Sequence, residues 1–443
     1  MKRLKVILVV VILAATSFAI TTSATATATE NDLIALCESL YGSAFGIPNS
    51  EPFGPCQWDM AVINAGTESY AIATGKGVTV GVIDSGIDFN HPDIAPNLDV
   101  DRSCSFIFDD TPTALPAEIA NGDCSNKAAV QDYSGHGTHV ASTIASPVNG
   151  IGIAGVAPEA TIVALKACTG AGYCFADSVA AALRYAGDND IDIVNLSLFA
   201  DPYLYYCKSE AAQRAILKDL EDAARYARQK GVLIVASAGN EAADLQHPGI
   251  DDISPDWPPG SEEVRDVENN CRVAPAELSG ALTVSATGPV GFPGYDYWIA
   301  DYSSVGMSRV DVTAPGGDYF RATGTVQDAI LAATSSTGDI FTGYDPLEAF
   351  YPGITALSGG ARYVYLNGTS MSSPHAAGVA ALVKENHPDW GPDAVKAAVM
   401  RTAQQLECPT TFLANDPRTC YGNNGRTSFF GTGLVDALAA AGE

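Results

Sequence analysis

The feature that most constrains the fold is an alternation that begins near Val78, where short apolar runs are separated by longer stretches with helical periodicity. Strands are expected at Val78–Ile83, Ile162–Leu165, Ile191–Leu196, Val232–Ala236 and Leu282–Ser285, and helices at Ala176–Tyr185 and Ala211–Lys230. Strands that are apolar throughout and separated by helices indicate a parallel sheet that is buried on both faces. We therefore expect an α/β fold of three layers, with a mostly parallel central sheet, helices on both faces and loop insertions. Ligands bind at the carboxyl ends of the strands in such sheets.

The first residues predict an export signal. Three basic residues precede Val6–Ile20, an uncharged and mostly apolar stretch that is too short to span a bilayer comfortably. Overlapping A-x-A cleavage patterns follow at Ser23–Ala28. Residues 1–28 are therefore expected to form a signal peptide that is removed, and an uncleaved anchor is the alternative.

The rest of the chain is expected to form one large domain behind a short extension. Residues 29–56 are too few to fold alone, so we interpret them as an N-terminal extension. Residues 57–443 are expected to form the main domain. Gly- and Pro-rich stretches near 241–275 and 316–362 interrupt the alternating pattern, and we interpret both as insertions.

Ten cysteines follow the expected signal peptide. An even number of cysteines behind an export signal indicates disulfides and a secreted, extracellular protein. No two cysteines have C-x-x-C spacing, which argues against a thiolate metal site. Closeness in the chain suggests the following pairs, although the sequence leaves the connectivity open: Cys37–Cys56, Cys104–Cys124, Cys168–Cys174, Cys207–Cys271 and Cys408–Cys420.

The composition is strongly acidic, with 51 Asp and Glu against 24 Lys and Arg and a formal net charge of −27. Loss of the signal peptide would remove three basic residues and no acidic one. A surface of this charge repels phosphate groups. We therefore expect no nucleic-acid partner, and no membrane partner after the signal is removed. The chain is expected to be a monomer, although the sequence does not fix the oligomeric state.

Two motifs offer a carboxylate and an imidazole. Asp84 follows the first expected strand, a position where an Asp is usually only a turn or capping residue. Glycines flank His136 in the run SGHGTH, which lets the backbone and a substrate approach its ring closely. His139 is expected to be a structural histidine on the same helix. The H-x-x-H spacing lacks the Glu of a zinc-binding helix, so a metal is not expected there.

Two further motifs offer a hydroxyl and an amide. Ser370 begins an apolar helix of small residues in the run NGTSMSSPH, where free N–H groups and the positive end of the helix dipole face whatever the hydroxyl attacks. This is a suitable position for an acyl-transfer nucleophile, although a serine there more often only caps the helix. Asn240 ends the run ASAGN after an expected strand, where its amide can donate to a developing oxyanion.

Taken together, the runs VIDSGID, GHGTHVAS, ASAGNE and NGTSMSSPH resemble the subtilisin-like serine protease family, from about Gln57 to near the C-terminus. The resemblance implies a subtilisin-like fold and a secreted serine endopeptidase that hydrolyses peptide bonds through an acyl-enzyme. Asp84 would orient His136, which would be the general acid and base. Ser370 would be the nucleophile, and Asn240 would be the oxyanion donor. Protein or peptide substrates are the implied partners.

The resemblance also implies where a substrate binds. It would pair as an additional strand between Lys166–Tyr173 and Asn195–Ala200. Phe199 stands where the family usually has glycine, so the preference of the primary pocket stays open, and Glu241 is a candidate for recognising a basic residue there. The implied substrate-binding residues are Thr169, Gly170, Gly172, Phe175, Ser197, Leu198, Phe199, Ser237 and Gly239.

The loop after the His136 helix has the spacing of the family's strong calcium site. The implied ligands are the side chains of Asn149, Asp93 and Gln57 and the carbonyls of Pro147, Ile151 and Ile153. These are hard oxygen donors, which calcium prefers, and the ion would be structural. An ordinary turn stiffened by Pro and Gly is the alternative.

Two rival interpretations remain. Acid-active relatives with a Ser-Glu-Asp set would need a glutamate near His136 and an aspartate near Asn240, and the sequence has neither replacement. A non-catalytic binding module with the same fold would be expected to carry a broken motif, whereas all four motifs are intact. The binding module is the alternative that we keep.

Overall fold

The structure is a computed structural model that describes residues 29–294, 298–337, 355–409, 416, 418–423 and 425–443. The expected signal peptide, residues 1–28, and part of the second expected insertion lie outside the described residues. Within the described part of the chain, no helix is long and apolar enough to cross a membrane.

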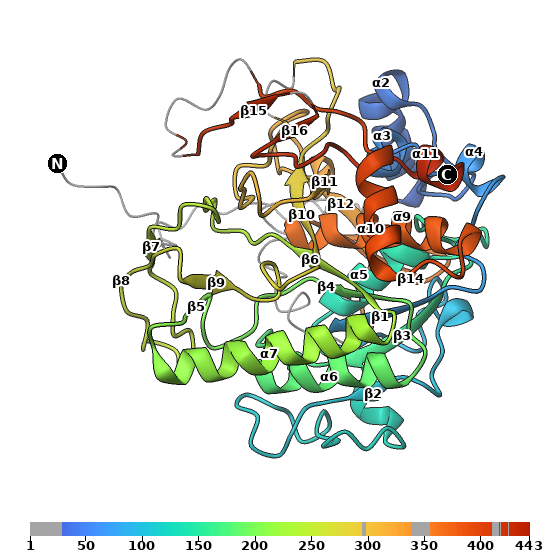
Figure 1. The fold of residues 1–443 in the computed structure, drawn as a ribbon. Coiled ribbons are helices and arrows are strands. Elements are labelled where there is room, and N and C mark those ends of the chain that lie inside the picture. The colour runs from blue at the N-terminus through green and yellow to red at the C-terminus, as the bar shows by residue number, and fades with distance from the viewer. Residues whose placement is uncertain (1–28, 295–297, 338–354, 410–415, 417, 424) are drawn as a thin grey trace, which may run out of the picture.

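A seven-stranded sheet forms the centre of the molecule, in the order β11-β10-β6-β4-β1-β3-β2 (Figure 1). Its strands are β1 (Thr79–Asp84), β2 (Cys104–Ser105), β3 (Thr161–Lys166), β4 (Ile193–Leu196), β6 (Leu233–Ser237), β10 (Leu282–Thr287) and β11 (Val312–Pro315). Every pairing between neighbours is parallel. The predicted α/β fold with a mostly parallel sheet is confirmed.

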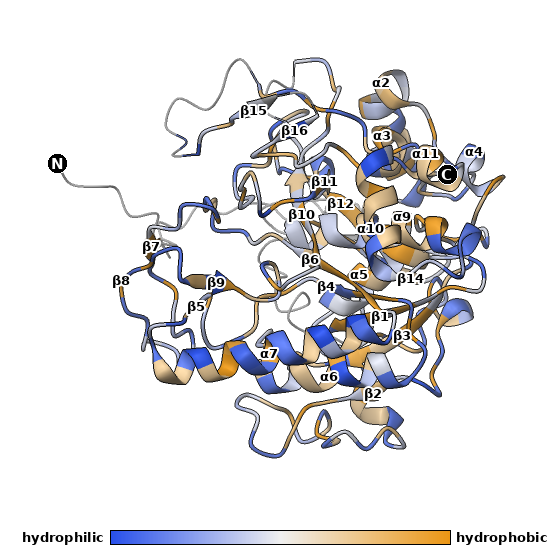
Figure 2. Ribbon diagram, viewed as in Figure 1, coloured by the Kyte–Doolittle hydropathy of each residue, from blue (hydrophilic) through white to orange (hydrophobic). Residues whose placement is uncertain are grey.

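Helices cover both faces of the sheet. The helices α6 (Ala176–Asp188) and α7 (Ala211–Gln229) pack against each other in the lower half of the view in Figure 1, above the loop that follows β2. The other face is covered by α5 (His136–Ala145), α9 (Thr369–Asn386) and α10 (Pro392–Thr402). The ribbon of α7 mixes hydrophilic and hydrophobic residues, as expected of a helix with one face on a sheet (Figure 2).

Alternate residues of β1 separate the core into two parts. Val80 and Val82 join the apolar cluster under α5 and α9, whereas Ile83 joins the cluster under α6 and α7. This is the two-residue period of a strand. Both faces are apolar because both are covered, which explains why the sequence of this strand shows no polar alternation.

The N-terminal extension is part of this core. It forms α1 (Glu30–Cys37), a π-helical turn at Glu38–Gly42 and α2 (Ser43–Phe45), and α3 (Trp58–Val62) and α4 (Thr67–Tyr70) follow it. Cys37, Tyr41 and Phe53 are completely buried in the cluster of α5 and α9. The Tyr41 hydroxyl donates a hydrogen bond of 2.9 Å to Asp328 Oδ1. The extension therefore contributes side chains to the main core.

Both expected insertions contain short strands. The first holds β7 (Ile250–Asp251), β8 (Arg265–Asp266) and β9 (Cys271–Val273), and β9 pairs with β5 (Tyr205–Cys207). The second holds the antiparallel strands β12 (Ile330–Ala333), β13 (Thr355–Ser358) and β14 (Ala361–Leu366), of which β14 leads into α9. A hairpin of β15 (Gly422–Asn423) and β16 (Arg426–Thr427) and the helix α11 (Ala437–Ala441) complete the chain.

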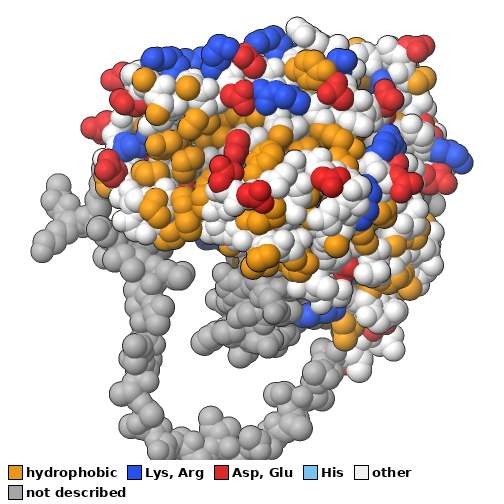
Figure 3. Space-filling model, turned by 90° about the horizontal axis from the view of Figure 1, so that it is seen from below, with side chains coloured by type: hydrophobic (Ala, Val, Ile, Leu, Met, Phe, Trp, Pro, Cys, Tyr) orange, Lys and Arg blue, Asp and Glu red, His pale blue; other side chains and the backbone are white. Residues whose placement is uncertain are grey.

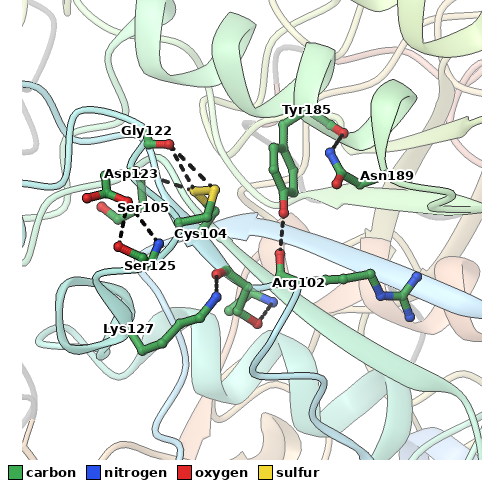
Figure 4. Close-up of a disulfide and its surroundings, with 12 residues drawn as sticks. Arg102, Cys104, Ser105, Gly122, Asp123, Ser125, Lys127, Tyr185 and Asn189 are labelled. Carbon is green, nitrogen blue, oxygen red and sulfur yellow. Dashed lines mark hydrogen bonds between the residues drawn. A yellow bond between two sulfur atoms is a disulfide. The ribbon is translucent and has the colours of Figure 1, made fainter.

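All five disulfides suggested from chain proximity are present. Cys104–Cys124 closes the loop that follows β2, and Figure 4 shows its surroundings. The Lys127 ammonium donates to the carbonyls of Asp101 and Ser103, at 2.7 and 2.9 Å, and fastens the end of this loop beside the start of β2. On the face seen in Figure 3, acidic and basic side chains are interspersed with apolar ones.

Candidate active site

Asp84 and His136 meet at the carboxyl end of the sheet. Asp84 is the last residue of β1 and is buried, and His136 is the first residue of α5. The distance between His136 Nδ1 and Asp84 Oδ1 is 2.8 Å. Since the carboxylate can only accept, the hydrogen bond fixes a proton on Nδ1 and leaves Nε2 of the neutral ring as the basic atom.

Burial and charge act in opposite directions on His136. Burial lowers the pKa of the imidazole, whereas the charge of Asp84 and its hydrogen bond raise it, and the net result is a pKa above the usual value of 6.5. The side chain is still 26% exposed, so a substrate can reach the ring.

Close backbone contact explains the glycine after His136. An added Cβ at Gly137 would lie 2.2 Å from the carbonyl oxygen of Gly86 and 3.2 Å from Asp84 Cβ. The start of α5 is also capped by the buried Asp132, which accepts hydrogen bonds from Ser134, Gly135 and Thr138. The sequence analysis missed Asp132, although a carboxylate just before a helix start is a recognisable capping signal.

Ser370 lies in the first turn of α9, near the carboxyl end of β4, which is the strand next to β1. Its hydroxyl donates to the carbonyl of Ser197 at 3.2 Å. The register pairs Ile83 of β1 with Leu196, the last residue of β4, so Asp84 and Ser197 each follow this last pair on neighbouring chains. Among the described residues, no hydrogen bond joins the Ser370 hydroxyl to His136. Rotation about the Cβ–Oγ bond of Ser370 would direct the hydroxyl proton away from Ser197. Hydrogen bonds between catalytic residues are often long before a substrate binds.

The side-chain amide of Asn240 has a defined orientation. Its Oδ1 accepts hydrogen bonds of 2.9 Å from both the backbone N–H and the hydroxyl of Thr369. Because the backbone N–H can only donate, the atom that faces it must be the amide oxygen. The Nδ2 group is therefore left to donate, on an exposed residue beside the start of α9.

His139 does not belong to this group. It is completely buried, and its Nε2 lies 3.2 Å from the carbonyls of Ile330 and Val364. Burial lowers its pKa to about 3. Within the described part of the chain, no three His, Cys, Asp or Glu side chains are grouped so as to hold a metal ion. His139 is thus a neutral structural residue, as expected.

The first predicted substrate edge is a tight loop. The disulfide Cys168–Cys174 closes it, and the Thr169 N–H donates to the carbonyl of Tyr173. The Gly170 N–H donates at 2.7 Å to Glu118, a buried residue that also pairs with the Lys166 ammonium at 2.9 Å. Glu118 was missed by the sequence analysis because it lies about fifty residues away in an irregular loop.

The second predicted edge passes close to the nucleophile. The Ser197 hydroxyl donates to the Ser370 carbonyl at 2.8 Å, and Leu198 and Phe199 are half-buried. The Phe199 ring packs against the apolar cluster of the first insertion rather than against the main core. Ser237 is the last residue of β6, and Gly239 lies between this strand and Asn240. The Gly239 N–H donates to the Thr369 hydroxyl.

An aromatic group stands at the far end of these edges. The backbone of Phe175 forms an isolated β-bridge with Asp201. The Phe175 ring stacks on Tyr173, with ring centroids 5.9 Å apart, and meets the Trp257 ring edge-on at 6.4 Å. Trp257 belongs to the first insertion, so the sequence analysis had no local signal for it. The two edges are therefore joined to each other beyond Phe175.

The loop of the expected calcium site surrounds a buried carboxylate. Asp93 accepts hydrogen bonds from Asn149 Nδ2, the Ile153 N–H and the Tyr363 hydroxyl, at 3.1, 3.2 and 3.0 Å. Burial raises its pKa to about 8. Gln57 is completely buried, and its Oε1 accepts from Asn49 and from the backbone of Ala154.

Other features of this loop suit a cation. Glu51, also buried, accepts from the Gly150 N–H at 2.8 Å, and burial raises its pKa. No Lys, Arg or His side chain of the described chain forms an ion pair with Asp93 or Glu51. Among the described residues, the carbonyls of Pro147, Ile151 and Ile153 accept no hydrogen bond. Two uncompensated carboxylates beside unused carbonyl oxygens fit a hard divalent cation.

Comparison with known proteins identifies the family. The model of the subtilase family matches residues 75–433. Subtilisin Savinase of Lederbergia lenta is 30% identical over 383 residues, which cover 86% of this chain and 97% of that protein. M-protease of Shouchella clausii is also 30% identical, over 86% of this chain and 69% of that protein.

Solved structures share the fold. The nisin leader peptidase NisP of Lactococcus lactis has a TM-score of 0.62 at 21% identity, over 89% of this chain and 95% of that one. Fervidolysin of Fervidobacterium pennivorans, a keratinolytic enzyme related to subtilisin, has a TM-score of 0.60 at 26% identity, over 90% of this chain and 47% of that one. The chain therefore belongs to the subtilase family and is a serine endopeptidase with a subtilisin-like fold.

Proposed function

We propose that Ser370 attacks the substrate carbonyl while His136 takes its proton. The observation that supports this best is the 2.8 Å hydrogen bond between Asp84 and His136, which leaves Nε2 as the base. The Ser370 hydroxyl, at the start of α9, contacts Ser197 just after the neighbouring strand β4. The proton then passes from Nε2 to the leaving amine, and the bond between carbon and nitrogen breaks. Water, activated by the same imidazole, releases the acyl group from Ser370.

Two donors stabilise the oxyanion in this proposal. Asn240 Nδ2 is directed away from Thr369 because its oxygen is held there, and the Ser370 N–H lies in the first turn of α9, where backbone N–H groups have no acceptor within the helix. Both donors are in place before the reaction, so little reorganisation is needed when negative charge develops on the carbonyl oxygen.

Replacement of Asn240 tests this assignment. Asn240→Ala is expected to lower kcat about a hundredfold to a thousandfold with little change in KM, because the donor acts mainly in the transition state. The size of this loss is carried over from subtilisin, in which the same kind of donor has been removed. Steady-state kinetics on a peptide p-nitroanilide measure it. A matched control is Asn126→Ala, in the loop after β2. An equal loss in both variants, or a rise in KM alone, contradicts the oxyanion role.

The function is tested by covalent labelling. A fluorophosphonate probe should label the folded protein near neutral pH, and mass spectrometry of the digest should place the label on Ser370. Heat-denatured protein should not react, because an isolated serine hydroxyl is a poor nucleophile. Absence of labelling of the folded protein would point to the alternative, a binding module without this catalytic centre, and labelling of a different residue would contradict the assignment of Ser370 as the nucleophile.

We also propose that the loop at residues 147–153 holds a structural calcium ion. Asp93, Asn149 and the carbonyls of Pro147, Ile151 and Ile153 would bind it, with Gln57 as a further oxygen donor. The two buried carboxylates, Asp93 and Glu51, support this assignment because a divalent cation would offset their charge. The ion would stabilise the fold and take no part in the reaction.

Removal of the ion is expected to lower stability. EGTA should lower Tm by about 5 °C, because saturating calcium stabilises only the folded state. Asp93→Asn should melt at the same temperature with and without EGTA, whereas Asp252→Asn, on an exposed residue, should respond like the wild type. Differential scanning calorimetry measures Tm of the wild type and of both variants, with and without EGTA. A wild-type Tm that EGTA leaves unchanged refutes the calcium site.

The signal-like first residues and the five disulfides support export of the chain. We infer that it acts outside the cell, as a monomer, on proteins or peptides. We propose no nucleic-acid partner, because the acidic composition of the chain would repel phosphate groups.

A further inference from the structure

A cavity of about 410 Å³ lies next to the catalytic run. It is lined by Asp301, Asp318, Tyr319, Phe320, Arg321 and Asn367. Asn367 stands three residues before Ser370. The turn at Gly316 packs directly behind this run, because an added Cβ there would lie 2.6 Å from the Gly368 carbonyl oxygen. The cavity is therefore adjacent to the start of α9.

The strand order indicates which part of a substrate passes this cavity. The two edges proposed to hold the acyl half of the substrate follow β3 and β4. Asp301 follows β10 and Asp318 follows β11, at the opposite end of the sheet, and β6 with Asn240 stands between the two regions. A substrate that extends across Ser370 therefore places the residues after its scissile bond at this cavity. This placement of the substrate rests on the proposed function.

The lining of the cavity suits a long basic side chain. Arg321 forms ion pairs with Asp301 and with Asp318. Asp301 keeps 41% of its side chain exposed. Phe320 is 42% exposed, and its ring centroid lies 6.0 Å from that of Tyr319. Aliphatic carbons of a Lys or Arg can rest on these rings while the cation meets a carboxylate.

The loop that forms this lining is held rigidly. The buried Asp328 accepts hydrogen bonds of 2.9 Å from the N–H groups of Ala322 and Thr323, and one from the Tyr41 hydroxyl. Phe320 has a φ of 63°, a left-handed conformation that is rare for a bulky residue. Such conformations persist where the surroundings impose them, and they are concentrated at binding sites.

We propose that this cavity is a subsite that selects a basic residue on the C-terminal side of the scissile bond. Asp301 is the residue that determines this specificity, because its carboxylate is the more exposed of the two. The aromatic rings of Tyr319 and Phe320 hold the aliphatic part of the side chain.

The test uses quenched fluorescent peptides that differ only in the two residues after the cut, which are Lys, Ala or Glu. Each kcat/KM is divided by that of the same enzyme on a p-nitroanilide, whose leaving group contains no amino-acid residue. The wild type should favour Lys over Glu by about tenfold. Asp301→Asn should reduce the ratio to about twofold, and the charge reversal Asp301→Lys should favour Glu.

Asp219→Asn is the matched control. Asp219 forms a comparably exposed pair with Arg184, between α6 and α7, and this variant should keep the wild-type ratio. A wild type without preference, or an equal preference in the wild type and both Asp301 variants, overturns the subsite. Fluorophosphonate labelling is measured in parallel and does not involve residues after the cut. Normal labelling with no Lys preference therefore refutes the subsite alone, whereas lost labelling refutes the catalytic assignment.

Discussion

Ser370→Ala is expected to lower kcat about 10⁶-fold while the protein still folds. The side chain makes one hydrogen bond, to the Ser197 carbonyl, and is only half-buried, so its loss should cost about 1 kcal/mol of stability. The catalytic cost is large because a nucleophile and its base act as a unit. Burst kinetics and steady-state hydrolysis of a peptide p-nitroanilide measure the loss.

Ser372→Ala provides the control for this experiment. Ser372 lies two residues further along α9 and donates to the Thr369 carbonyl at 2.9 Å. Its variant should lose a similar amount of stability and retain near-normal turnover. If Ser370→Ala keeps more than about a hundredth of wild-type kcat, Ser370 is not the nucleophile.

Asp84→Asn is expected to lower kcat about 10⁴-fold, the second-largest effect. An amide in this position can donate to Nδ1, which favours the tautomer with the proton on Nε2, where it cannot act as a base. Asp99→Asn, which removes an acid on a loop beside β3, is the control and should leave kcat unchanged. A loss below about tenfold contradicts the orienting role of Asp84.

The pH dependence provides an independent test of the same pair. Catalysis needs neutral His136, so kcat/KM of the wild type should rise with pH, with a midpoint above 6.5 because the pKa of His136 is raised. Asp84→Asn removes the charge and hydrogen bond that raise this pKa and leaves the burial that lowers it. The residual activity of this variant should therefore have a lower midpoint. A midpoint that stays the same, or moves upward, contradicts the electrostatic role of Asp84.

The interior of the fold could be predicted from the sequence because buried strands are apolar along their whole length. All five expected strands and both expected helices are present, with ends shifted by at most three residues. The edge strand β2 was missed because it has only two residues. The strand β11 was missed because its run Val312–Pro315 is short and ends in proline, a residue that is depleted in strands.

The proposed catalytic residues could be picked out from the sequence because each stands in a local motif that glycine or a helix start makes recognisable. Residues that support the site from a distance could not. Glu118 and Trp257 reach the substrate edges from irregular loops, and Tyr363 reaches Asp93 from β14. Their sequence neighbours carry no periodicity or turn signal that relates them to the site, so only tertiary structure brings them there.

The central claim is that Ser370, His136 and Asn240 converge on one substrate carbonyl. A crystal structure of the protein with a fluorophosphonate adduct tests it most directly. We predict a phosphorus atom bonded to Ser370 Oγ, with one phosphoryl oxygen about 3 Å from both Asn240 Nδ2 and the Ser370 N–H, and His136 Nε2 within hydrogen-bonding distance of the adduct. An adduct whose phosphoryl oxygen points away from Asn240, or an imidazole that no longer contacts Asp84, would contradict the account.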